Sequence, residues 1–163
     1  MMSAAEPELE AVRAIVAAGR TAAVTTRTAG GALHSRPLAV LDDEFDGTLH
    51  FFTQDPSAKT AEIATHPEVN VSIGDGKGWV SLAGTASVTH DPGLLDRYWN
   101  AWADSYFDGG RGDPTAAILE VRVETLEYWD LRKPAVAQLF EVLKGVVTKS
   151  EPDLGESGTA DLR

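Results

Sequence analysis

A short polar turn followed by a lysine gives the first sign of chemistry in this sequence. Ser57 follows the turn residues Asp55 and Pro56 and is a good N-cap for a helix over 58–65, with Lys59 in its first turn. The first N–H groups of a helix lack intrahelical partners, and the helix dipole is positive at that end. With the ammonium of Lys59 added, the segment predicts a site for an anion such as phosphate. A capped connector helix would show the same pattern, so the neighbouring residues must decide.

Several other positions could converge on this site. Pro37 lies inside a predicted strand, and because proline cannot donate a ladder hydrogen bond, we expect an edge or a bulge there, with Arg36 and Leu38 beside it. Thr53 ends the strand that precedes the turn. Trp129, near the end of the last long predicted strand, either covers the core or stacks on a ligand. Together these side chains could bind a phosphate group and a planar ring.

The elements that must position these residues are mostly strands joined by short turns. Alternating apolar residues, caps and turn signals predict strands over 21–26, 33–41, 48–53, 68–74, 79–90 and 117–128, and helices over 7–18, 58–65 and about 91–99. We therefore expect a mainly β (α+β) fold, an antiparallel barrel with helices packed outside it. Residues 136–142 fit either a short strand or a helical turn.

Composition limits both the domain organisation and the partners. The chain has 163 residues, 43% of them hydrophobic, which suits one domain, and we place it at residues 1–143 with a flexible tail over 144–163. A net charge of −11 argues against nucleic acid and anionic membranes as partners. A phosphate-bearing ligand would then be held by a few local cations, which favours a small cofactor.

Other classes of site lack their motifs. The chain has no cysteine, no Gly-x-Gly-x-x-Gly after a strand, no phosphate-binding loop of the Gly-Lys-Ser/Thr type and no Gly-x-Ser-x-Gly. The four histidines are scattered singly, so we predict no metal site. Since no leader pattern and no apolar run of membrane-spanning length occurs, we expect a cytoplasmic protein.

Four short motifs, in order and with fitting spacing, resemble a known family. His34–Leu38, Phe51–Thr53, Ser57-x-Lys59 and Tyr128–Asp130 are similar to segments of the FMN-binding split-barrel proteins related to pyridoxamine 5′-phosphate oxidase, above all the general stress protein branch. The resemblance runs from about residue 8 to about residue 143. It implies a six-stranded antiparallel split β-barrel with flanking helices, and a homodimer with one FMN in each of two clefts at the subunit interface.

The same resemblance implies a set of cofactor-binding residues. It places Arg36 to Leu38 along the flavin ring and ribityl chain, Ser57 and Lys59 at the phosphate, and Trp129 in the cleft of the partner subunit. The full set carried over is Ser35, Arg36, Pro37, Leu38, Phe52, Thr53, Ser57, Lys59 and Trp129.

Two departures from the oxidase bear on activity. Ala58 stands where the oxidase has an arginine, and losing one charge-assisted contact costs about 1.5–3 kcal/mol, or about ten- to a hundredfold in affinity. Residues 130–134 do not reproduce the Arg-x-His element that grips the substrate phosphate of the oxidase. We therefore do not expect pyridoxamine 5′-phosphate oxidation.

The resemblance leaves three functions open. The first is an FMN-dependent oxidoreductase of the general stress type with an unassigned substrate, in which the flavin does the chemistry. The second is a non-catalytic protein that binds or sequesters flavin. The third is a split barrel that holds a deazaflavin or haem instead. No residue stands out as a catalytic acid or base.

Overall fold

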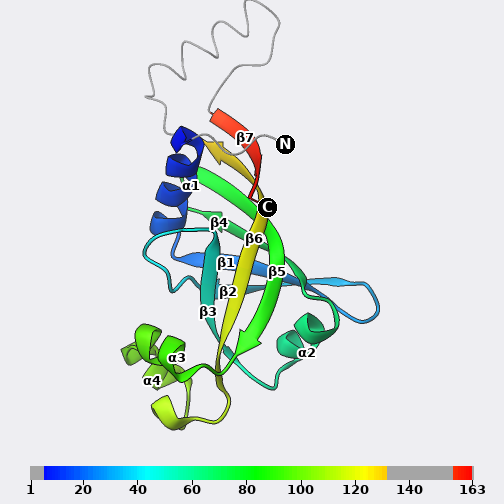
Figure 1. The fold of residues 1–163 in the computed structure, drawn as a ribbon, viewed down its shortest axis with the longest axis vertical. Helices are drawn as coiled ribbons and strands as arrows, with labels where there is room; N and C mark the ends of the chain where they lie inside the picture. The colour runs from blue at the N-terminus through cyan, green and yellow to red at the C-terminus, as the bar shows by residue number, and fades with distance from the viewer. Residues whose placement is uncertain (1–5, 132–155, 163) are drawn as a thin grey trace, which may run out of the picture.

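An antiparallel sheet, strongly curled and flanked by helices, makes up most of the molecule (Figure 1). The computed structural model describes residues 6–131 and 156–162. Its helices are α1 (Glu6–Ala18), α2 (Ala58–Thr65), α3 (Pro92–Tyr98), α4 (Ala101–Tyr106) and the 3-10 helix η1 (Gly110–Gly112). Its strands are β1 (Thr21–Arg27), β2 (Leu33–Ala39), β3 (Thr48–Gln54), β4 (Glu68–Gly74), β5 (Gly78–Thr89), β6 (Ala116–Asp130) and β7 (Glu156–Asp161).

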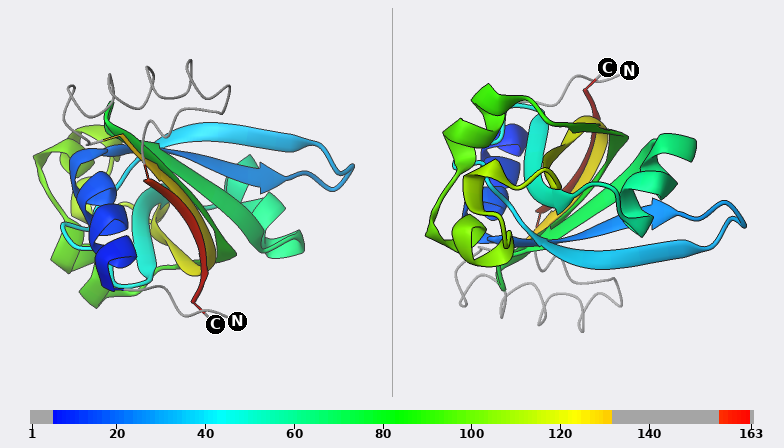
Figure 2. Two further views of the ribbon diagram at one scale, coloured as in Figure 1. Left: turned by 90° about the horizontal axis from the view of Figure 1, so that it is seen from above. Right: turned by 90° about the horizontal axis from the view of Figure 1, so that it is seen from below.

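The sheet closes into a barrel at one point and opens beyond it. Its strand order is β2-β1-β4-β5-β6-β3, so β2 and β3 are the outermost strands of this path. The backbone N–H of Leu41, just after β2, donates to the carbonyl of His50 on β3 over 3.0 Å, which joins the two ends. The β1–β2 hairpin projects from the body, and α2 lies beside it (Figure 2). The split-barrel fold expected from the sequence is thereby confirmed.

Alternation along the strands builds the main core. On β1 and β4, every second side chain is buried, among them Val24 and Val71, and α1 covers one side of the barrel with Val12, Ile15 and Val16. Burying a side chain of this size contributes about 1.5–3 kcal/mol. A second, smaller cluster lies under α3 and α4. Helix α4 lies in a segment for which the sequence pattern predicts neither a helix nor a strand.

Strand β7 corrects part of the predicted tail. Residues 156–161 pair with β6 from Thr125 to Asp130, next to the stretch of β6 that pairs with β3. A flexible tail over 144–163 is therefore wrong for these residues. Their sequence has no apolar alternation, and the strand forms because the edge of β6 beyond β3 offers N–H and C=O groups. The domain boundary at 143 and the segment 136–142 lie outside the described residues.

No helix in the described ranges is long and apolar enough to span a membrane.

Candidate functional site

The N-terminus of α2 has the geometry expected of an anion site. The Ser57 hydroxyl accepts a hydrogen bond from the Thr60 N–H at 3.3 Å, and the Thr60 hydroxyl accepts one from the Ser57 N–H at 2.9 Å. This capping box confirms Ser57 as the N-cap. Neither Ala58 nor Lys59 has a partner for its N–H group in the part of the chain that the structure describes. Two backbone donors therefore remain for a ligand.

Lys59 is a cation held largely out of water. The residue is only 9% exposed, and its ammonium makes no hydrogen bond or ion pair with any side chain in residues 6–131 or 156–162. Burial, and then the positive charge of Arg36, lower the pKa of Lys59. Because a buried charge without a counter-ion is unfavourable, this lysine fits an anion that comes from outside the chain.

Arg36 lies next to Lys59 and is held by a network from two other elements. Its Nη1 donates to the Thr26 hydroxyl on β1 at 2.7 Å, and its Nη2 donates to both carboxylate oxygens of Glu62 on α2 at 3.2 and 3.1 Å. Thr26 in turn donates to Glu62 at 2.5 Å, and His34 lies 3.5 Å from the same carboxylate. The hydroxyl of Thr26, and with it Arg36 and His34, lower the pKa of Glu62.

The side chains around Pro37 alternate between the two faces of the edge strand β2. Pro37 lies in this outermost strand, which confirms the edge expected there. The side chain of Leu38 packs against the main core, on the same face as Arg36. The Ser35 hydroxyl lies on the other face, 2.7 Å from the hydroxyl of Thr25. A cavity of about 300 Å³ borders Ser35 to Pro37 and extends to Trp79 on β5.

Phe52 and Thr53 do not present their side chains to a ligand in this conformation. Phe52 is 4% exposed and packs edge-on against Trp99 and Phe107 under α3 and α4. Thr53 is fully buried. They lie at the end of β3, where the turn that leads to Ser57 begins. Their burial therefore anchors the strand end from which the anion site follows.

Trp129 lies near the end of β6 that is opposite to the turn before α2. Along β6, Ala117 pairs with Thr53 near the turn, and Trp129 comes close to the other end. At about 3.3 Å per residue, the two positions are roughly 40 Å apart along the strand. This is a length along a curled strand and not a distance through space, and Trp79, the cross-strand neighbour of Trp129, lines the same cavity as Arg36.

A second tryptophan accompanies Trp129, and sequence reasoning missed it. Trp79 on β5 is paired in register with Trp129, and the two residues are 48% and 44% exposed. A cavity of about 320 Å³ lies beside them. The alternation of buried residues that starts at Val80 already indicates that Trp79 faces away from the core. Sequence reasoning also missed Thr26 and Glu62.

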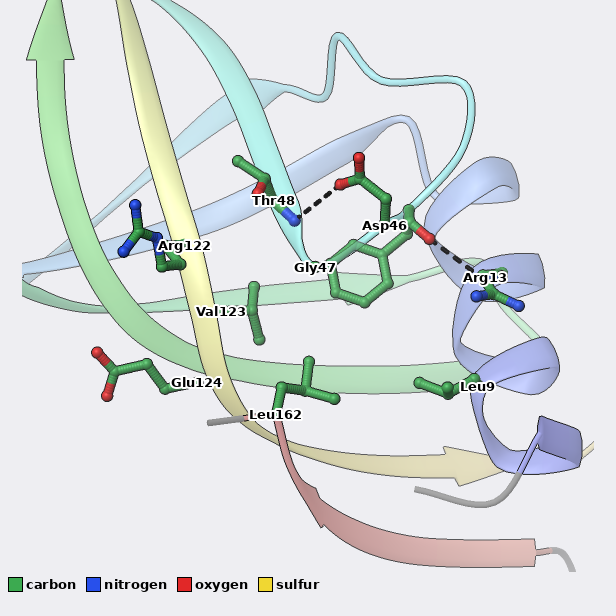
Figure 3. Close-up of a pocket in the computed structure, with 10 residues that line it drawn as sticks. Leu9, Arg13, Asp46, Gly47, Thr48, Arg122, Val123, Glu124 and Leu162 are labelled. Carbon is green, nitrogen blue, oxygen red and sulfur yellow. Dashed lines mark hydrogen bonds between the residues drawn. The ribbon is translucent and has the colours of Figure 1, made fainter. Parts of the chain in front are cut away.

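A larger hollow than these two lies elsewhere (Figure 3). It measures about 850 Å³ and opens where β6 passes from pairing with β3 to pairing with β7. Two of its charged groups are bound by the chain itself, since Arg13 donates to the Phe45 carbonyl and Asp46 accepts from the Thr48 N–H. None of the site residues predicted from the sequence lines it. We therefore place the candidate site at Lys59.

A charged cluster around His50 also lies outside the candidate site. His50 Nδ1 is 2.8 Å from the carboxylate of Asp42, its Nε2 is 3.4 Å from Glu120, and the Tyr98 hydroxyl donates to Asp42 at 2.7 Å. The hydrogen bond to Asp42 raises the pKa of His50 against the opposing effect of burial. Every polar group in this cluster has a partner, which indicates a structural role: it ties α3 and the loop after β2 to β3.

Comparison with known proteins gives one family match and two sequence relatives. The family model described as "Pyridoxamine 5'-phosphate oxidase like" matches residues 7–153. Protein bli-3 of Neurospora crassa is 33% identical over 140 residues, which cover 77% of this chain and 66% of that protein, just under two thirds of its length. General stress protein 26 of Bacillus subtilis is 30% identical over 101 residues, covering 59% of this chain and 70% of that protein.

Solved structures share the fold. A general stress protein 26 from Jannaschia sp. CCS1 superposes with a TM-score of 0.68 at 23% identity, covering 94% of both chains. The general stress FMN/FAD binding protein of Xanthomonas citri gives a TM-score of 0.63 at 23% identity, covering 77% of this chain and 87% of that one. At these identities the likeness shows the fold.

Proposed function

This chain belongs to the pyridoxamine 5′-phosphate oxidase-like family, and from this premise we propose that it binds FMN, with the phosphate at the N-terminus of α2. The observation that carries the proposal is Lys59, a lysine that is only 9% exposed and has no counter-ion among the described residues. The N–H groups of Ala58 and Lys59 point the same way as the helix dipole, and both favour an anion. The name of the Xanthomonas citri structure, an FMN/FAD binding protein, agrees with this ligand class.

The charges of the site fit a small phosphate ester. Lys59 and Arg36 carry two positive charges, and Glu62 supplies one negative charge, so the site keeps a surplus of one in a chain whose net charge is −11. The negative charge of a phosphate group would offset this surplus and would favour the charged form of Lys59. Ala58 adds no charge where the oxidase has an arginine, so we expect moderate rather than tight binding.

The rest of the flavin would lie along β2, and a second copy of the chain would complete the cleft. Pro37 and its neighbours form an outer strand whose free edge can approach a planar ring. Trp129 is exposed on the surface near the end of β6, and in a homodimer it would reach the cleft of the partner subunit, as the family resemblance implies. Trp79 and Leu131 are exposed beside it, and they would be covered in such a dimer.

When bound, the flavin supplies the redox chemistry, and this chain binds and orients it. Around the anion site, the carboxylate of Glu62 and the hydroxyl of Thr26 are both engaged with Arg36. Both groups are therefore taken up in holding Arg36, and Lys59 is left for the phosphate. The engagement of Glu62 and Thr26 supports, as a second candidate function beside an oxidoreductase, a protein that holds the flavin without turning over a substrate. Reduction of the bound flavin by NADH or NADPH, followed by absorbance, separates the two.

Titration with FMN, followed by quenching of flavin fluorescence, tests the proposal. The wild-type protein should bind FMN more tightly than riboflavin, which lacks the phosphate. Lys59→Ala should weaken FMN binding about ten- to a hundredfold, the effect of losing one charge-assisted contact. Arg20→Ala is the matched control, because it removes one exposed positive charge elsewhere. Equal FMN affinity in the wild type and Lys59→Ala would refute the phosphate assignment.

A further inference from the structure

Glu62 lies at the centre of the network beside the anion site, one helical turn after Lys59. Both of its carboxylate oxygens are occupied: Arg36 contacts both, Thr26 donates to one, and His34 lies near the other. The glutamate side chain is 13% exposed and the arginine side chain 29% exposed. The contact is therefore shielded from water far more than an ordinary surface ion pair.

The hydroxyl of Thr26 links Arg36 to Glu62 by two hydrogen bonds of fixed direction. Thr26 is fully buried, and its single proton is given to Glu62 while its oxygen accepts from Arg36. A hydroxyl can donate only once, so this orientation requires an acceptor oxygen at Glu62. The three residues come from β1, β2 and α2, and together they fix the guanidinium of Arg36 relative to the first turn of α2.

Lys59 receives none of this compensation. No ion pair joins its ammonium to Glu62 within the described residues, although the two residues lie three apart on the same helix. Glu62 is taken up by Arg36, Thr26 and His34. The carboxylate therefore balances the arginine and leaves the lysine charge for a ligand.

We propose that Glu62 is a positioning residue of the anion site, which holds Arg36 beside Lys59 so that both cations face the phosphate of the flavin. The inference rests on the proposed function and adds a residue that acts through Arg36 rather than on the ligand. Glu62 thereby favours a phosphorylated flavin over riboflavin. Simple repulsion between the Glu62 carboxylate and the phosphate would have the opposite effect. Positioning by Glu62 raises the affinity for FMN relative to riboflavin, whereas repulsion lowers it.

The test compares two ligands in Glu62→Gln, which keeps the shape of the side chain but offers one acceptor oxygen instead of two. Affinity for FMN should fall about tenfold, while affinity for riboflavin should change less than about threefold, so their ratio falls. Glu68→Gln is the matched control, because Glu68 is exposed at the start of β4. A rise in the ratio would show repulsion, and an equal loss for both ligands would show a merely structural role; either overturns the proposal.

A second measurement does not depend on the flavin. In protein labelled with 15N, the guanidinium protons of Arg36 should give separate, slowly exchanging signals in the wild type and averaged ones in Glu62→Gln. Unchanged signals in the variant would overturn the inference even if FMN binds. If the wild type binds no flavin, the proposed function fails, and the Arg36 signals still decide whether Glu62 holds the guanidinium.

Discussion

At the scale of single residues, Lys59 shows a conflict between stability and binding. Its stem is buried, its ammonium lies near Arg36, and no carboxylate in the described chain compensates it. A buried cation without a counter-ion destabilises the cofactor-free protein, and a bound anion would compensate its charge. Residues of this kind are typical of binding sites, where function is maintained at some cost in stability.

Replacing this lysine with an apolar residue should therefore stabilise the free protein. Because the folded-state pKa of Lys59 is lowered, charging it disfavours the folded state, and wild-type stability rises as pH increases through that lowered pKa. Lys59→Met should raise the free energy of unfolding at neutral pH by about 0.5–1 kcal/mol while weakening FMN binding. Urea unfolding without flavin measures the first effect. Arg20→Met, which removes an exposed positive charge elsewhere, should leave FMN binding unchanged and should not raise the free energy of unfolding. A less stable Lys59→Met would contradict the reasoning.

At the scale of secondary-structure elements, the cluster around His50 holds three segments together. The ring of His50 on β3 lies between Asp42, in the loop after β2, and Glu120 on β6, while Tyr98 on α3 donates to Asp42. Both ring nitrogens face carboxylates, so the doubly protonated imidazolium satisfies all contacts. Burial raises the pKa of Asp42, but the hydrogen bonds from His50 and Tyr98 outweigh it and leave that pKa lowered.

These shifts predict a pH window for the contribution of the cluster to stability. His50 has a raised folded-state pKa, so its contribution is complete below the unfolded value of about 6.5 and is lost as pH rises through the raised value. Asp42 has a lowered folded-state pKa. Its contribution is therefore present above the unfolded pKa of about 3.9 and is lost as pH falls through the lowered folded-state pKa. The cluster should stabilise most between about pH 4 and pH 6.5.

The measurement is the difference in unfolding free energy between wild type and His50→Asn at several pH values. We expect this difference to shrink by about 1 kcal/mol between pH 6 and pH 9, after allowance for solvent screening. His66→Asn, outside the cluster, serves as the control. A difference that stays constant with pH would show that His50 contributes through packing alone.

At the scale of the whole molecule, the proposed dimer would combine residues from opposite ends of β6 in one flavin cleft. Lys59 follows the end of β3 that pairs with the start of β6, whereas Trp129 lies near the end of β6. Trp79 and Trp129 form one exposed aromatic surface, because the two residues are cross-strand neighbours on one face. In the proposed dimer, a second copy of the chain would supply this aromatic surface to the cleft.

Mixing two defective variants tests this arrangement. Lys59→Ala and Trp129→Ala should each weaken FMN binding when alone, because every cleft then lacks one residue. A mixed dimer has one cleft with both changes and one with neither, so mixing should restore wild-type affinity in part of the population. Titration with FMN after joint refolding measures this recovery. Affinity that stays low in dimers shown to be mixed would mean that each cleft uses residues of one chain only.

Local sequence determined the elements around the candidate site. The turn before α2 and its Ser57 cap follow from side chains that bond backbone groups a few residues away. The strands follow from a two-residue alternation that places one face in the core. The edge position of Pro37 follows from its missing N–H group. Each of these features depends on near neighbours, so the sequence alone predicts them.

The tertiary structure decided which distant groups meet. Thr26, Arg36 and Glu62 belong to three elements, and only the closure of the barrel and the packing of α2 bring them within hydrogen-bonding distance. The same holds for β7, which pairs through backbone groups and has no side-chain pattern of its own. The sequence by itself placed a cation at a helix N-terminus. That Lys59 is buried and uncompensated depends on packing across the fold, because burial and counter-ions are properties of the surroundings and not of the residue.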